Sequence, residues 1–151
     1  MPGYGVPKDR KELLGWSHAE ERLERAQQYW VTTTDVDGAP HAVPVWGLWI
    51  DGALYFAGGP QIRWTRNLRH NPRVAVHLES GEDVVILEGT AEWFEDANDP
   101  VVKRLDELSG EKYAMPSEGV PCWRLRPAVA FGWTLARFPK DATRWQFDDP
   151  A

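Results

Sequence analysis

Four arginines stand out because they fall in a stretch of chain that has no acidic side chain. The stretch lies between Asp51 and Glu79, and its basic residues are Arg63, Arg66, Arg69, His70, Arg73 and His77. Guanidinium groups form paired hydrogen bonds with phosphate and carboxylate oxygens. The stretch therefore indicates a site for an anionic ligand. The alternative is a solvated basic helix face whose acidic partners lie elsewhere in the chain.

The residues around these arginines favour the ligand. Gly58-Gly59-Pro60 predicts a turn that opens a helix at its proline, which leaves backbone N–H groups free at the positive end of the helix dipole. Trp64 and Leu68 are expected to face the core, and Arg69 lies off the basic face. That basic face carries Arg63, Arg66, Asn67 and His70. The arrangement predicts a phosphate site, although it is neither a GxGxxG turn nor a P-loop.

Side chains for proton transfer, nucleophilic attack or metal binding form no comparable pattern. The histidines at positions 18, 41, 70 and 77 lack metal-ligand spacing, and no serine stands in a GxSxG context. Cys122 lies in an apolar stretch, where we expect an inert buried thiol. Trp46, Trp49 and Trp64 could wall a planar ring, although most tryptophans are core residues. We therefore predict no catalytic side chain and no metal site. Such a protein could still serve a cofactor that carries its own redox chemistry, because this cofactor needs from the protein only binding, orientation and exclusion of water.

Hydrophobic periodicity predicts the elements that must hold this site. A helix is expected from about Ser17 to Gln27, where Ser17 and Glu20 have capping-box spacing. Another is expected to begin at Asp99-Pro100 and to end at Gly110. Six strands are expected at Tyr29–Thr34, His41–Ile50, Ala53–Phe56, Arg73–Glu79, Val84–Trp93 and Cys122–Ala136. This order favours a mainly β fold, a small closed barrel with flanking helices.

The expected strand His41–Ile50 contains a contradiction. It is apolar on both alternating faces, as in a strand covered on both sides, yet it includes Pro44, which has no N–H to donate. We therefore expect irregular backbone around Val43 to Trp46. Bulges gather near barrel rims and active sites, and the alternative is a bulge that only bends the strand.

Length and composition exclude several classes of function. The chain has 151 residues and a mass of 17.2 kDa, with 42% hydrophobic and 26% charged residues and a net charge of −6. These values fit one domain over residues 1–151, with a loose arm at 1–16 and a tail at 139–151. The acidic charge argues against a nucleic-acid partner, and no apolar run is long enough to span a membrane. The single cysteine and the lack of a signal peptide favour the cytoplasm.

Three segments in this order resemble the pyridoxamine-phosphate-oxidase-like split-barrel superfamily. They are YWVTTTDVDGAPHAVPVWGLWIDGALYF, GGPQIRWTRNLRHNPRVAVHLE and VVILEGTAEW, and the later WRLRP resembles the last barrel strand of that family. The nearest branch is that of the small flavin- and deazaflavin-dependent (F420) oxidoreductases. The resemblance implies a six-stranded Greek-key split barrel and a homodimer, with FMN or F420 in a groove at the dimer interface.

The resemblance also implies which residues bind the cofactor. In relatives, the strand that matches Val43 to Trp46 runs along the tricyclic ring, and the segment that matches Gly59 to Asn67 binds the phosphate. Ile62 and Trp64 depart from relatives, which often have a small hydroxyl residue and a lysine there. The cofactor-binding residues implied in this chain are Val43, Pro44, Val45, Trp46, Gly59, Arg63, Trp64, Arg66 and Asn67.

These observations lead to three hypotheses. The first is an oxidoreductase that transfers a hydride from reduced FMN or F420 to a small unsaturated or aromatic substrate. The second is a non-catalytic carrier of the same fold that binds a flavin, a deazaflavin or a haem-like ligand. The third is a basic-helix interaction module without a small ligand, against which the acidic net charge counts. We expect the first, as a cytoplasmic homodimer with no nucleic-acid or membrane partner.

Overall fold

The computed structural model describes residues 12–115 and 121–147, so most of the arm expected at 1–16 lies outside the described residues. Its elements in chain order are α1 (Trp16–Arg25), β1 (Tyr29–Thr34), β2 (Pro40–Val45), β3 (Leu48–Ile50), β4 (Ala53–Phe56), α2 (Arg63–His70), β5 (Arg73–His77), β6 (Asp83–Phe94), α3 (Val101–Tyr113), β7 (Cys122–Thr134) and β8 (Thr143–Gln146). None of these helices is long and apolar enough to cross a membrane.

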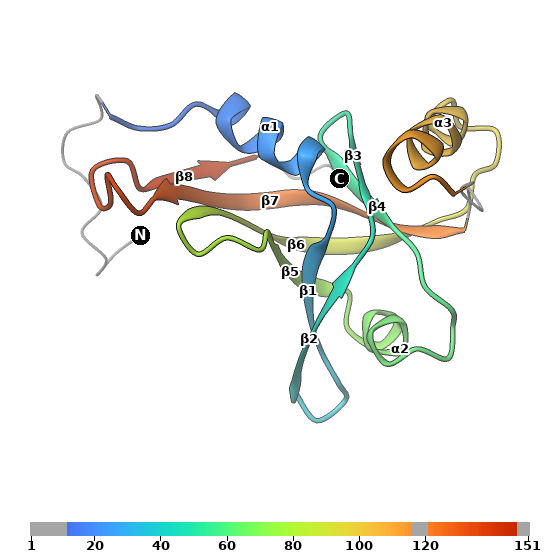
Figure 1. Cartoon of the computed structure of the whole chain (residues 1–151). Coiled ribbons are helices and arrows are strands. Elements are labelled where there is room, and N and C mark those ends of the chain that lie inside the picture. The colour runs from blue at the N-terminus through green and yellow to red at the C-terminus, as the bar shows by residue number, and fades with distance from the viewer. Residues whose placement is uncertain (1–11, 116–120, 148–151) are drawn as a thin grey trace.

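One antiparallel sheet dominates the fold, in the strand order β2-β1-β5-β6-β7-β4-β3, with β8 beside β7. Figure 1 shows α1 above the sheet, α3 above the right-hand end of β7, and α2 below the sheet. The mainly β fold with flanking helices that the sequence predicts is confirmed. The described residues hold eight strands instead of six, because the expected strand His41–Ile50 is divided into β2 and β3 and part of the expected tail forms β8.

The connection between β2 and β3 forces the sheet to curl. These two strands occupy opposite edges of the sheet, yet only Trp46 and Gly47 lie between them. Seven strands would place the edges of a flat sheet roughly 29 Å apart, at about 4.8 Å per strand spacing. The three Cα–Cα steps from β2 to β3 span at most about 11 Å. The edges must therefore approach each other, and Trp46 and Gly47 bridge the seam.

The irregular backbone expected around Pro44 is wrong. The β1–β2 ladder has no register shift, and it pairs Trp30 with Pro44 and Val31 with Val43. Because β2 is an edge strand, its proline can turn its nitrogen away from the partner strand. The expectation that His41–Ile50 is covered on both faces is wrong for β2, of which no residue is buried, and correct for β3, of which all three residues are buried. The break in the strand falls two residues later, at Trp46.

The main core lies inside the curl. Its centre is formed by inward-facing residues of four strands, namely Val31, Val76, Leu87 and Leu125, all of which are fully buried. These residues alternate with outward-facing neighbours, as the two-residue period of a strand requires. Helix α1 covers this core with Ala19 and Leu23.

Helix α1 starts earlier than expected, and this changes the role of its first turn. It begins at Trp16 after Gly15, which provides no side-chain cap, so the capping box expected from Ser17 and Glu20 is absent. The carboxylate of Glu20 instead accepts a hydrogen bond from Trp49 Nε1 at 3.0 Å. Glu20, which the sequence pattern predicted to cap the start of α1, therefore connects α1 to β3.

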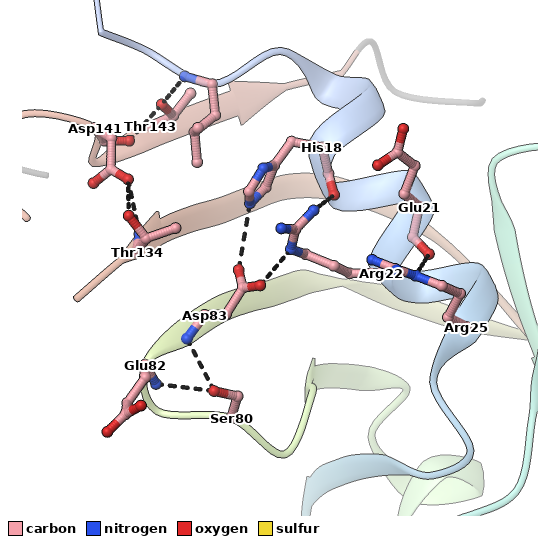
Figure 2. A network of polar contacts seen from close by, with 11 residues as sticks. His18, Glu21, Arg22, Arg25, Ser80, Glu82, Asp83, Thr134, Asp141 and Thr143 are labelled. Carbon is pink, nitrogen blue, oxygen red and sulfur yellow. Dashed lines mark hydrogen bonds and ion pairs between the residues drawn. The ribbon is translucent and has the colours of Figure 1, made fainter. Parts of the chain in front are cut away.

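Polar contacts fix α1 and β8 against the long strands (Figure 2). The carboxylate of Asp83, at the start of β6, lies 2.6 Å from Arg22 Nε and 3.4 Å from His18 Nε2 of α1. The fully buried carboxylate of Asp141 accepts hydrogen bonds from the backbone N–H and the hydroxyl of Thr134, at 2.9 and 2.6 Å. These charged groups therefore hold helices and strands together at the end of the molecule away from α2.

Helix α3 covers a second, smaller core on the side of β3 and β4 that faces away from the main core. This core is formed by Leu48, Ile50, Ala53, Tyr55, Phe94, Val101, Leu105 and Cys122. As expected, Asp99 caps the helix start, because its carboxylate accepts the N–H of Val101 at 2.9 Å. The helix does not end at Gly110: it continues to Tyr113, and Ala114 then takes a left-handed conformation with φ of 54°.

Helix α2 begins at Arg63, three residues later than the expected start at Pro60. The chain makes a tight turn first, in which the carbonyl of Gly59 accepts hydrogen bonds from Ile62 N–H and from the Thr65 hydroxyl. Gly58 allows this turn to pass close to the core. A Cβ at this position would lie 2.5 Å from the indole of Trp64.

We expect Gly58→Ala to lower the free energy of unfolding by about 1–3 kcal/mol, because overpacking against a buried indole forces a shift of side chain or backbone. Gly59→Ala is the matched control. The nearest atom to its added Cβ is 3.9 Å away, and we expect a change within about 0.5 kcal/mol. Urea unfolding of both variants measures the difference, and equal effects would contradict this packing of the turn.

Candidate functional site

The two segments that the resemblance assigns to the cofactor lie next to each other in the fold. Helix α2 packs on β1, the strand that pairs with β2. The side-chain amide of Asn67 donates a hydrogen bond to the Thr33 hydroxyl at 3.0 Å, and that of Asn71 donates to the Thr34 hydroxyl at 3.2 Å. These bonds fix the basic helix beside the β1–β2 hairpin.

The start of α2 approaches the turn of this hairpin. In the turn, the carboxylate of Asp35 accepts the N–H groups of Asp37 and Ala39, both at 2.9 Å. These backbone hydrogen bonds lower the pKa of Asp35, and the positive charge of Arg63 lowers it further. Arg63 therefore lies close enough to the hairpin for its charge to act there.

The first turn of α2 has no capping side chain and two exposed arginines. Its N-cap, Ile62, supplies no side-chain hydrogen bond, so the backbone N–H groups at positions 63 to 65 have no capping side chain. Arg63 and Arg66 are exposed, and among the described residues neither forms a salt bridge. Free helix N–H groups together with unpaired guanidinium groups form a site suited to an anion.

Two of the implied cofactor residues on α2 have buried side chains. Trp64 is 3% exposed and packs on Phe56 with ring centroids 5.5 Å apart, so its indole is a core group as its helical position predicted. Asn67 is 6% exposed, so the prediction that it shares the basic face with Arg63 and Arg66 is wrong. The reason is the buried hydroxyl of Thr33, which takes the Asn67 amide as its partner.

Arg69, which was predicted to lie off the basic face of α2, lies near the turn Gly58-Gly59-Pro60. Its guanidinium sits over the ring of Trp93, 5.5 Å from the centroid. Together with Trp93 and Thr65, it lines a pocket of about 520 Å³ that also includes Gly58-Gly59-Pro60. Arg69 is therefore not a remote residue, and the turn that contains Gly59 borders an open pocket.

The implied residues on β2 lie on two sides of an edge strand. Val43 and Val45 are half-buried and pack against the main core, whereas Pro44 faces solvent. Trp46, just after the strand, is 52% exposed. Its indole stacks on the ring of Tyr113 with a centroid distance of 4.5 Å and an interplanar angle of 6°. Sequence reasoning missed Tyr113, because α3 was expected to end at Gly110.

The end of α3 holds the peptide of Gly47, which joins the two edges of the sheet. The N–H of Gly47 donates to Tyr113 Oη at 3.0 Å, and Lys112 Nζ donates to the Gly47 carbonyl at 3.0 Å. Lys112 Nζ also donates to Tyr29 Oη at 2.8 Å. We call these three side chains, Tyr29, Lys112 and Tyr113, the Gly47 clamp.

The Gly47 clamp has perturbed protonation equilibria because it is partly desolvated. Burial lowers the pKa of Lys112 to about 8. Burial raises the pKa of Tyr29, with a further rise from Tyr113, and burial also raises the pKa of Tyr113 itself. The clamp therefore combines a lysine that gives up its proton easily with tyrosines that keep theirs at neutral pH.

Other titratable groups carry structural roles. Cys122 is 4% exposed and burial raises its pKa to about 11, which fits the inert thiol predicted from the sequence. His18, in the first turn of α1, contacts the carboxylate of Asp83. Within residues 12–115 and 121–147, no three His, Cys, Asp or Glu side chains cluster in a way that could hold a metal ion.

The family of the chain follows from comparison with known proteins. A family model described as pyridoxamine 5'-phosphate oxidase matches residues 16–133. The chain therefore belongs to the pyridoxamine 5'-phosphate oxidase family, and its curled antiparallel sheet is the split barrel that the sequence predicts. No curated protein gives a significant match.

Solved structures that resemble this chain belong to proteins with different descriptions. An F420 reductase is 23% identical, with 74% of this chain and 94% of that chain covered and a TM-score of 0.57. A conserved hypothetical protein from Mycobacterium tuberculosis is 22% identical, with coverages of 85% and 91% and a TM-score of 0.69. A heme binding protein from Mycobacterium smegmatis is 20% identical, with coverages of 89% and 59% and a TM-score of 0.66. At these identities the likeness shows the fold alone.

The lowered pKa of Lys112 makes stability depend on pH. Its pKa is about 8 in the folded chain, against a usual value of 10.5, so between these values the unfolded chain binds more protons. Lys112 therefore makes the free energy of unfolding rise as the pH increases from 8 to 10.5. This increase is lost again as the pH falls through 8. Lys112→Met removes this contribution. We expect the stability of the wild type relative to this variant to rise from pH 8 to 10 and to stay level below pH 7.

Urea unfolding at each pH measures this dependence. Lys103→Met is the control, because Lys103 lies on the same helix and is 84% exposed. The same pH profile for both variants would contradict the desolvation of Lys112.

Proposed function

We propose that this chain is an FMN- or F420-dependent oxidoreductase that transfers a hydride to a small organic substrate. The observation that carries the proposal is the uncapped start of α2, with Arg63 and Arg66 exposed beside it. When bound, the flavin or deazaflavin ring would supply the hydride chemistry. The family and the likeness to an F420 reductase fold support this choice.

The residues of α2 fit the phosphate of such a cofactor. A phosphate needs several N–H donors and a compensating positive charge, and both are present at positions 63 to 66. Gly59 lies at the mouth of the adjoining pocket, where its lack of a side chain lets a ligand approach the backbone. Trp64 would contribute only its backbone N–H, since its indole is buried.

The residues of β2 fit the planar ring. Val43, Val45 and Trp46 offer apolar surface, and Pro44 adds a ring without a hydrogen-bond donor. Their role would be to orient the ring and to exclude water from it. No side chain in these segments is placed to act as an obligatory acid or base, and the proposal assigns no catalytic residue to the protein.

We also propose that two copies of the chain form the working unit. The ladders align one outward-facing row across five strands: Pro44, Trp30, His77, Ile86 and Phe131. Trp30 and His77 stack in this row with an interplanar angle of 7°. A row with this much apolar and aromatic surface favours a covering partner, and a two-fold pairing of identical surfaces is the usual closed solution. The row includes Pro44, so a second copy there would border the proposed ring site.

A non-catalytic carrier is the second candidate, supported by the likeness to a heme binding protein fold. Reduction of the FMN- or F420-loaded protein followed by a screen of acceptors separates the two. An enzyme would pass its hydride to an acceptor faster than the free reduced cofactor does. A carrier would slow this transfer, because the protein would shield the ring.

We expect Arg63→Ala and Arg66→Ala each to weaken cofactor binding by about 10- to 150-fold. A charge-assisted hydrogen bond contributes roughly 1.5–3 kcal/mol, and about 1.4 kcal/mol corresponds to a factor of ten. Fluorescence titration with FMN and with F420 measures the dissociation constants. Loss of an arginine should also flatten their dependence on salt.

Arg73→Ala is the control for this experiment. Arg73 is exposed at the start of β5, outside the glycine turn and its pocket, whereas Arg69 borders that pocket. We expect its dissociation constant to stay within twofold of the wild type. Equal, small effects from Arg63→Ala, Arg66→Ala and Arg73→Ala would mean that the basic helix is only a solvated face.

A further inference from the structure

A second pocket opens between α3 and the β3–β4 hairpin, on the side of the sheet away from the main core. Its volume is about 200 Å³. Its lining residues come from the seam, the hairpin, α3 and the start of β7, with Trp46, Tyr55, Leu105, Ser109, Tyr113 and Cys122 as the main side chains. It is therefore built on the second core and lies apart from the phosphate donors of α2.

This pocket adjoins both segments that we propose for the cofactor. One of its lining residues is Trp46, which directly follows Val45 of the proposed ring site. Another is Ala57, which directly precedes Gly58 and also lines the 520 Å³ pocket at the glycine turn. A ligand in the smaller pocket would thus lie beside a cofactor that spans β2 and the start of α2.

The lining has no charged side chain, and two of its hydroxyl groups, those of Ser109 and Tyr113, already have acceptors. The Ser109 hydroxyl donates to the Met115 carbonyl at 3.0 Å. The Tyr113 hydroxyl lies within 2.9 Å of the carbonyls of Gln27 and Gly47, to one of which it donates. A charged ligand would lose its hydration without gaining a partner here. The chemistry of the pocket selects a neutral ligand.

The size and shape of the pocket restrict the ligand further. A cavity of about 150 Å³ accepts benzene, whereas pockets for drug-sized ligands hold roughly 300–1,000 Å³. The volume here suits one ring with small substituents. The nearly parallel rings of Trp46 and Tyr113 form a flat wall at the entrance, which favours a planar ring. Because the N–H of Gly47 donates a hydrogen bond to Tyr113 Oη and so holds this ring in place, the wall is pre-organised.

We propose that the pocket between α3 and the β3–β4 hairpin is the substrate pocket and that it binds a neutral monocyclic aromatic ring of the substrate. Its role as the substrate pocket rests on the proposed oxidoreductase function. The aromatic ring would insert between Trp46 and Leu105, with its reducible group directed toward the cofactor at the Trp46 side.

Binding of 4-fluoroacetophenone, followed by ¹⁹F NMR titration, tests this pocket with a neutral monocyclic aromatic ketone. Two variants fill the pocket from different elements: Ser109→Phe on α3, and Ala57→Phe at an exposed position just after β4. The matched control is Glu107→Phe, an exposed position on the opposite side of α3 that does not line the pocket. We expect each pocket variant to weaken binding about tenfold or more, and the control to stay within twofold of the wild type.

The titration is carried out on the protein without added cofactor and again with FMN or F420, and thermal unfolding checks that each variant is folded. Equal binding of the probe by the wild type, Ser109→Phe and Ala57→Phe would overturn the pocket assignment, even where the cofactor binds normally. Selective loss of probe binding in these variants, in a chain that binds neither FMN nor F420, would support the ring site and overturn the oxidoreductase proposal.

Discussion

The two edges of one sheet have to meet across Trp46 and Gly47, and the rest of the molecule depends on this constraint. A connection this short between opposite edges is possible only in a curled sheet, and the curl encloses the main core. The peptide of Gly47 at the seam is held from outside the barrel by Lys112 and Tyr113 of α3. The seam therefore has a defined position, and so does the exposed indole that precedes it.

This arrangement places the surfaces that we propose for cofactor and substrate around one short segment, Trp46 and Gly47. On one side of the seam, β2 offers apolar surface beside the donors of α2. On the other side, α3 and the β3–β4 hairpin form the small uncharged pocket. The stacked pair of Trp46 and Tyr113 stands between them. The proposed cofactor site and the proposed substrate pocket would thus meet at Trp46, with the pocket formed largely by the helix that packs outside the barrel.

Local signals predicted much of this fold, and non-local contacts account for the errors. Turn residues such as glycine and β-branched segments predicted most of the strands and the basic helix. Such predictions succeed because strand and helix formation depends in large part on residues that are neighbours in sequence. The edge position of Pro44 depends on strand order, which no local pattern contains. The burial of Asn67 depends on Thr33, 34 residues away, and the clamp joins Gly47 to residues 65 and 66 positions later. The exposure of Arg63 and Arg66 on α2 could therefore be predicted from the sequence, whereas the burial of Asn67 and the contacts of α3 with Gly47 could not.

A crystal structure of the protein with FMN or F420 bound tests the central claim, that the seam and the start of α2 together hold the cofactor. We expect the phosphate within hydrogen-bond distance of Arg63, Arg66 and the first-turn N–H groups, and the ring along Val43 to Trp46. We also expect a two-fold partner on the outward-facing row. A phosphate bound away from α2, or a ring that does not touch Trp46, would show that the cofactor is held elsewhere.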